Sequence, residues 1–174
     1  VPPAEFILSS LDDLLYSQLG LFKTISNILG DHPLAGGQKS VREKLEKIRR
    51  LFTEARAPQQ VVDTLLELNR RLPGDARIFR PALPYEDLPN FAAAGFMDSP
   101  VSTSQEAAVV AAMMAGWASY WNELPFMARV QHGLGHFDYL PGAALMQLII
   151  ARAAGNMIIS EKEVVISAVH GQGQ

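Results

Sequence analysis

Residues 80–99 combine the side chains of this sequence that are best suited to bind a phosphate or a metal ion. The stretch reads R-P-A-L-P-Y-E-D-L-P-N-F-A-A-A-G-F-M-D-S, with one arginine, four acidic or amide side chains, three prolines and one glycine. Proline and glycine at this density exclude a regular helix, so we expect a shaped loop. Charged loops between core elements often carry ligand contacts, but a surface loop that caps its own turns has the same composition.

Arg80 is the strongest candidate for a ligand contact in this loop. A guanidinium group is charged at any working pH, and its forked donors match the geometry of phosphate oxygens. The alternative is a structural ion pair with Glu86 or Asp87, and the sequence leaves both interpretations open.

His132 and His136 are the other residues whose spacing suggests chemistry. Side chains four residues apart can share one helical face and hold a metal ion. Two glycines lie between these histidines, and no carboxylate or thiol motif completes a ligand set. We therefore assign no metal ligands from the sequence.

Composition narrows the class of protein. The 174 residues suffice for one domain with a substantial core, and 48% hydrophobic with 19% charged residues is typical of a globular protein. A net charge of −3 argues against nucleic-acid binding, because phosphates require a basic surplus. The sequence contains no cysteine, signal-peptide pattern or apolar run of membrane-spanning length, so we expect a cytoplasmic protein without a membrane partner.

The elements that must position this loop are helical in residues 1–141 and mainly strands in residues 142–174. Apolar periodicity predicts helices over 10–19, 21–29, 40–55, 58–72 and 103–118, three of them with capping boxes that begin at Ser10, Ser40 and Thr103. Short strands are expected at 5–9 and 77–80. Runs rich in Ile and Val predict that 143–150, 156–160 and 163–170 form two or three strands of one antiparallel sheet. The fold class is α+β.

Three blocks of this sequence resemble the ATP-grasp nucleotide-binding domain of phosphoenolpyruvate synthase, pyruvate phosphate dikinase and the glucan water dikinases. Residues 80–99 match the family signature R-S-S-S-N-A-E-D-L-P-N-F-N-G-A-G-L-Y-D-S without a gap. W-A-S-Y-W-N at 117–122 is similar to the family's W-A-S-L-W-N and is followed by Arg129 and Gly133. V-P-P-A-E-F at 1–6 is similar to V-P-P-G-F. Together the blocks span nearly the whole chain as a single partial domain, 1–174.

The resemblance implies an ATP-grasp-like lobe that binds ATP with Mg²⁺ and phosphorylates a histidine on a separate domain, from which pyruvate or another acceptor is phosphorylated. It assigns Arg80 to the nucleotide phosphates as the catalytic residue. It assigns Arg129 to the support of the phosphate site or of the core beneath it. The strand that carries Gln147 and runs to Ile150 would hold adenine through backbone groups. The partners implied are a nucleotide and the phosphohistidine domain.

Departures from the family pattern leave the activity open. Pro81, Ala82 and Leu83 replace the serines after the family's arginine, and Ala92 and Ala93 replace the N-G that lets the loop approach phosphate. G-Q-G-Q at 171–174 lacks the acidic residue of the family's G-L-G-E. The family's glycine-lysine segment and acidic metal strand have no counterpart here, so the chain is expected to be inactive alone. The alternative is a non-catalytic relative that acts as a protein-binding module.

Overall fold

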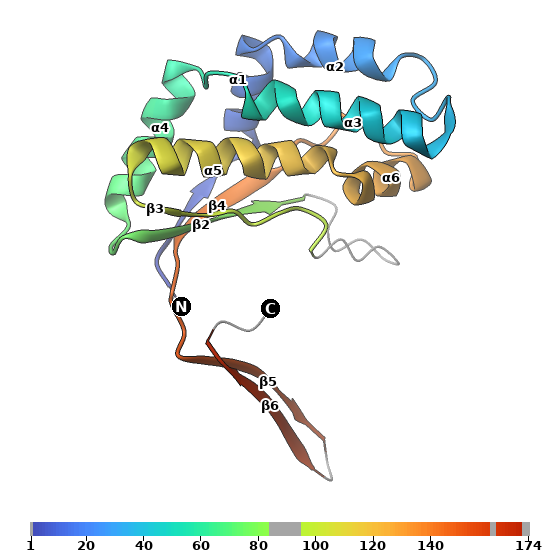
Figure 1. Cartoon of the computed structure of the whole chain (residues 1–174). Helices are drawn as coiled ribbons and strands as arrows, with labels where there is room; N and C mark the ends of the chain where they lie inside the picture. Colours follow the sequence, from blue (N-terminus) through green and yellow to red (C-terminus); the bar gives the residue numbers. More distant parts are fainter. Residues whose placement is uncertain (1, 84–94, 161–162, 172–174) are drawn as a thin grey trace.

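The computed structural model describes residues 2–83, 95–160 and 163–171. Helices cover one face of a four-stranded antiparallel sheet, and a two-stranded hairpin lies on the opposite side of that sheet (Figure 1). This arrangement confirms the α+β class. The helices are α1 (Ser9–Gln18), α2 (Leu21–Leu29), α3 (Gly37–Thr53), α4 (Gln59–Arg71), α5 (Glu106–Ala118) and α6 (Glu123–Gln131), with a 3-10 turn at η1 (Ser119–Trp121). The strands are β1 (Ala4–Ile7), β2 (Ala76–Ala82), β3 (Val101–Thr103), β4 (Gly142–Gln147), β5 (Ala153–Ile159) and β6 (Val164–His170).

The four-stranded sheet has the order β1-β4-β2-β3. The expectation that the last three strands share one sheet is wrong, because β4 pairs with β1 and β2 while β5 pairs with β6. The apolar pattern of β4 shows that it is a strand, but its partners lie far away in the sequence. Strands from the helical part of the chain therefore complete the sheet.

The helices bury the apolar faces that periodicity predicts. On α3, the apolar positions that repeat every three to four residues are all buried: Val41, Leu45, Ile48 and Phe52. The apolar helix α5 packs against β2, β3, α3 and α4, so it has a central place among the elements. Met113 and Met114 are buried in the core, as expected for methionines on a central helix.

Helix starts differ from the capping-box predictions. The residues that precede α1, α3 and α5 are Leu8, Gly36 and Gln105, and none of them caps its helix with a side-chain hydrogen bond. Gly36 has φ of 87°, a left-handed conformation that lets the chain enter α3 one turn before Ser40. At 17 residues, α3 is also longer than α5, which has 13.

Gly116 allows α5 to approach β2 closely. A Cβ built at this position would lie 2.3 Å from Cδ1 of Phe79, whose ring is buried edge-on against Trp117. We expect Gly116→Ala to lower the free energy of unfolding by roughly 1–2 kcal/mol, because the buried ring has little room to move. Chemical denaturation measures the loss, with Ala115→Gly as a control on helix propensity. An unchanged midpoint for Gly116→Ala would contradict this packing.

The hairpin of β5 and β6 exposes apolar side chains on both of its faces. Exposed fractions range from 44% for Val165 to 69% for Ile166. The pairing joins Ala153 to His170 at one end and Ile159 to Val164 at the other. The two strands carry no Asp, Glu, Lys or Arg within their bounds.

Candidate functional site

The face of the sheet away from the helices forms an open surface that carries Arg80. Side chains alternate along β2, so Arg77 and Phe79 are buried under the helices while Ile78 and Arg80 point to the other side. In register, Arg80 pairs with Ala144 of β4, and Ala144 pairs with Phe6 of β1. The next row consists of Ala4, Met146, Ile78 and Val101. We call these seven residues the open face; it is an apolar surface with one cation.

The side chain of Arg80 is exposed on the open face, and its guanidinium makes no hydrogen bond or ion pair with a described residue. Glu86 and Asp87, the partners of the alternative interpretation, lie outside the described residues, as do Ala92 and Ala93. A guanidinium presented in this way can accept an anionic ligand without first breaking a bond to the described part of the protein.

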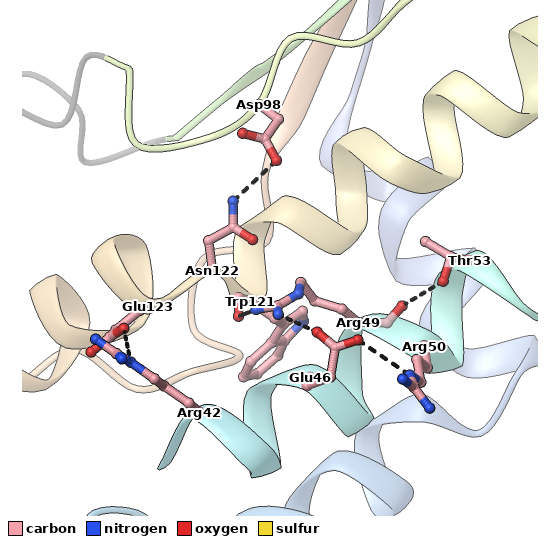
Figure 2. A network of polar contacts seen from close by, with 9 residues as sticks. All are labelled: Arg42, Glu46, Arg49, Arg50, Thr53, Asp98, Trp121, Asn122 and Glu123. Carbon is pink, nitrogen blue, oxygen red and sulfur yellow. Dashed lines mark hydrogen bonds and ion pairs between the residues drawn. The ribbon is translucent and has the colours of Figure 1, made fainter. Parts of the chain in front are cut away.

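Asp98 connects two of the sequence blocks. Its backbone N–H donates to Oγ of Ser119 at 3.0 Å, and its Oδ2 accepts from Nδ2 of Asn122 at 3.1 Å. Figure 2 shows the Asp98–Asn122 contact above the end of α5. Ser119 and Asn122 belong to the W-A-S-Y-W-N block, so the C-terminal end of the 80–99 stretch is fixed to η1.

A second set of contacts in Figure 2 joins α3 to η1 and α6. Nη1 of Arg49 on α3 donates to the carbonyl of Trp121 in η1 at 3.4 Å. Nε of Arg42 on α3 lies 2.7 Å from Oε2 of Glu123, the first residue of α6. Glu46 accepts from both Arg49 and Arg50 on the same helix, and these bonds lower the pKa of its carboxyl group. The contacts are largely exposed, so each stabilises the protein only slightly.

Arg129 lies inside the protein and not on the open face. Its side chain is fully buried, with the guanidinium carbon 3.8 Å from the ring centre of Tyr120 and Nη1 donating to the Tyr120 carbonyl at 3.1 Å. Nε donates to Nδ1 of His136 at 3.3 Å. Of the two roles that the resemblance gives Arg129, this position suits support of the core; its function stays a prediction.

His136 is held as a neutral acceptor. Its ring stacks on Phe126 at 4.7 Å, and burial, with the neighbouring charge of Arg129, lowers its pKa from 6.5 to about 4. His132 is exposed on the surface. The contacts of His136 with Arg129 and Phe126 contribute to the packing around α6. Within the described ranges, no third metal-ligating side chain lies near His132 and His136.

Gln147 and Ile150 lie where β4 leaves the sheet. Gln147 pairs with Arg77, three register positions from Arg80, and its side chain extends toward Gly74 on the opposite face. The N–H groups of Gln147 and Leu148 donate to the carbonyls of Pro3 and Ala76. Ile150 is 77% exposed. The adenine contacts assigned to this segment remain a prediction. The backbone N–H groups of Gln147 and Leu148 are already bonded within the protein, so the exposed residue Ile150 suits such a contact better.

The sequence reasoning missed the residues that accompany Arg80 on the open face. Phe6, Ile78 and Met146 provide its apolar surface, and they come from three strands that are distant in sequence. The spacing of Arg77 and Arg80 in the sequence could have indicated which arginine lies on the open face. Residues three apart in a strand point to opposite faces, so one arginine had to be buried and the other exposed.

Comparison with known proteins identifies the family of this chain. The family model for the pyruvate phosphate dikinase AMP/ATP-binding domain matches residues 1–174. The chain belongs to this family. Among curated proteins, the phosphoenolpyruvate synthase of Aeropyrum pernix is 22% identical over 186 residues, which cover all of this chain and 23% of the relative. A probable phosphoenolpyruvate synthase of Staphylothermus marinus is 26% identical over 188 residues and is covered to 22%. The chain thus spans less than a quarter of the length of these relatives.

The open face offers apolar side chains and one guanidinium. Apolar side chains can pack against a purine base, and an unengaged guanidinium can bind phosphate oxygens. For a divalent cation the situation differs. The described ranges contain no group of three or more His, Cys, Asp or Glu side chains that could hold one, so we assign no residue to Mg²⁺. Every helix in these ranges also falls short of the length and apolarity needed to cross a bilayer.

Proposed function

We propose that the chain binds ATP on the open face of the β1-β4-β2-β3 sheet, with Arg80 contacting the phosphates. The observation that carries this proposal is an exposed arginine, without a partner in the described residues, on an apolar sheet face of an AMP/ATP-binding domain. Ile78 and Met146 would contact the base. Arg80 would neutralise phosphate charge and hold the terminal phosphate in position.

In its wider context, the chain would form the ATP-binding part of a phosphoenolpyruvate-synthase-like phosphotransferase in the cytoplasm. The names of the two relatives support this proposal. The bound ATP would supply the phosphoryl group for a histidine on another domain, and pyruvate or another acceptor would receive it afterwards. Mg²⁺ would accompany the nucleotide through groups that we do not assign.

A second candidate function is a non-catalytic relative that binds a protein. The observation in its favour is that Pro81 and Leu83, which replace two serines of the family signature, contribute to packing. Pro81 packs toward Gly116, with a distance of 3.4 Å from its Cγ to a Cβ built there, and Leu83 is 7% exposed within the core. Two positions that carry hydroxyl groups in the family thus serve packing here.

Calorimetry with Mg²⁺·ATP tests the choice between these functions. We expect saturable binding that weakens at least tenfold in Arg80→Ala, because a charged hydrogen bond to phosphate contributes about 1.5–3 kcal/mol. Arg50→Ala is the matched control, since Arg50 is an exposed arginine on α3 that pairs with Glu46. Equal affinity of Arg80→Ala and the unaltered chain would contradict the role of Arg80. The absence of heat up to millimolar ATP with a folded chain would favour the protein-binding module.

A further inference from the structure

A cleft of about 560 Å³ lies on the helical side of the molecule, between the end of α3 and the first halves of α4 and α5. The loop that joins α3 to α4 closes one end of it. The described residues that line it are Thr53, Ala55, Arg56, Ala57, Gln59, Val62, Leu66, Glu106, Ala107, Val110, Ala111 and Met114. None of them belongs to the four-stranded sheet, so this cleft is separate from the open face.

The side of α5 that lines the cleft carries apolar residues although part of it is exposed to solvent. After Glu106 the helix reads A-A-V-V-A-A-M-M-A-G-W-A, although Ala107 and Ala111 are exposed. A helix at the surface normally carries charged or polar residues on its outer side. The small side chains of Ala107 and Ala111, one turn apart, also leave the space that forms the cleft. Val62, Leu66 and Met114 supply its apolar floor.

The charges at the rim of the cleft are not equivalent. Glu106 lies 3.8 Å from Nη2 of Arg70, so its carboxylate already has a cationic neighbour. Arg56, the one basic residue among the lining residues, is exposed and makes no hydrogen bond or ion pair with a described residue. The cleft therefore combines apolar side chains of α4 and α5 with the polar side chains of Thr53 and Gln59 and with one available positive charge.

We propose that this cleft binds a small amphipathic carboxylate, an alkyl or aryl acid whose apolar body lies against Val62 and Ala111 and whose carboxylate pairs with Arg56. The volume is within the range of about 300–1,000 Å³ that small-molecule sites occupy, and one charged group beside apolar walls is their usual composition. Charge complementarity favours an acid, because the guanidinium of Arg56 has no competing partner among the described residues. The carboxylate of the ligand would pair with Arg56 and not with Arg70, because Glu106 already lies beside Arg70 and would repel it.

Titration of the ¹⁵N-labelled chain with octanoate below its micellar concentration tests this proposal. We expect saturable chemical-shift changes at the backbone amides of Val62, Ala107 and Ala111. 1-Octanol has the same chain length but no charge, and we expect it to bind at least tenfold more weakly. Arg56→Gln is expected to weaken octanoate binding about tenfold. The control Arg50→Gln removes an exposed arginine of α3 that neither lines the cleft nor pairs with a residue that lines it, and it is expected to leave octanoate binding unchanged.

A second variant tests the contribution of the cleft's volume and leaves the charge of Arg56 unchanged. Ala111→Leu places a larger side chain on the exposed wall of α5, so it is expected to reduce octanoate binding at least tenfold while the chain stays folded. The proposal is overturned if octanoate and 1-octanol bind equally, if Ala111→Leu binds as the unaltered chain does, or if the shifts lie elsewhere, such as on the β5–β6 hairpin. Because the probe is not a nucleotide, failure here leaves the ATP measurements on Arg80 unaffected.

Discussion

Replacing Arg77 with leucine is expected to lower the free energy of unfolding by about 3–5 kcal/mol, the largest stability effect that we predict. Arg77 is 2% exposed, and its guanidinium closes the turn between α4 and β2. Nε donates to Oδ1 of Asn69 at 2.7 Å. The two Nη atoms donate to the carbonyls of Asn69, Leu72, Pro73, Gly74 and Ala76 at 2.8–3.4 Å.

The cost arises from the acceptors that leucine would leave behind. The last carbonyls of a helix have no partner within the helix, and Arg77 donates to one of them, Asn69, and to the carbonyl of Leu72, which follows α4. Its other backbone acceptors belong to the turn that leads into β2. Each buried acceptor that loses its donor costs about 1–3 kcal/mol. Urea denaturation followed by circular dichroism measures the change. Arg71→Leu, which alters an exposed arginine at the same helix end, should cost less than about 1 kcal/mol. Similar losses in the two variants would show that burial of the Arg77 guanidinium does not stabilise this turn.

The second large effect has the opposite sign, because Asp12→Asn is expected to stabilise the chain at pH 8. Asp12 is fully buried on α1, and neither of its carboxylate oxygens has a hydrogen-bond partner in the described structure. Burial, reinforced by the charge of Asp13, raises its pKa well above the usual 3.8. An asparagine of the same size has no charge to bury, so the expected gain is about 1–3 kcal/mol.

The pH dependence of this gain follows from proton linkage. Asp12 has a higher pKa in the folded chain than in the unfolded chain, so folding takes up a proton between those two values. Stability from this group is therefore complete below about pH 4 and falls as the pH rises toward the folded pKa. The difference between Asp12→Asn and the unaltered chain should be largest at pH 8 and should nearly vanish at pH 4.

Denaturant titrations at pH 4, 6 and 8 provide the measurement. Asp31→Asn is the matched control, since Asp31 is exposed in the loop after α2. We expect this exposed control to differ from the unaltered chain by less than about 0.5 kcal/mol. If Asp12→Asn were instead less stable than the unaltered chain at pH 8, a favourable interaction of the Asp12 carboxylate would have to exist, and the account of its burial would be wrong.

The parts of this fold that could be predicted from sequence depend on local patterns. The apolar face of α3 repeats every three to four residues, and the structure buries those positions. The bounds of α2 agree with the prediction because Gly20 and Gly30, both with positive φ, flank an apolar run. The partners of β4 could not be predicted in this way, since pairing with β1 and β2 depends on contacts between residues far apart in the chain.

The candidate site shows the same division. The family resemblance pointed to Arg80, and strand alternation explains why it is exposed while Arg77 is buried. The contacts of Asp98 with Ser119 and Asn122 join residues more than twenty positions apart, so no local pattern could reveal them. The buried Asp12 was also hidden from sequence reasoning, because an acid beside Asp13 at the start of a helix normally faces solvent.

Binding of a nucleotide to the open face of the four-stranded sheet can be measured directly in an ¹H–¹⁵N correlation spectrum recorded during a titration with Mg²⁺·ATP. We predict saturable shifts concentrated at the amides of Ile78, Arg80, Ala144 and Met146, with amides of α3 and α4 little changed. Shifts confined to the helical side, or an unchanged spectrum at millimolar Mg²⁺·ATP, would contradict it.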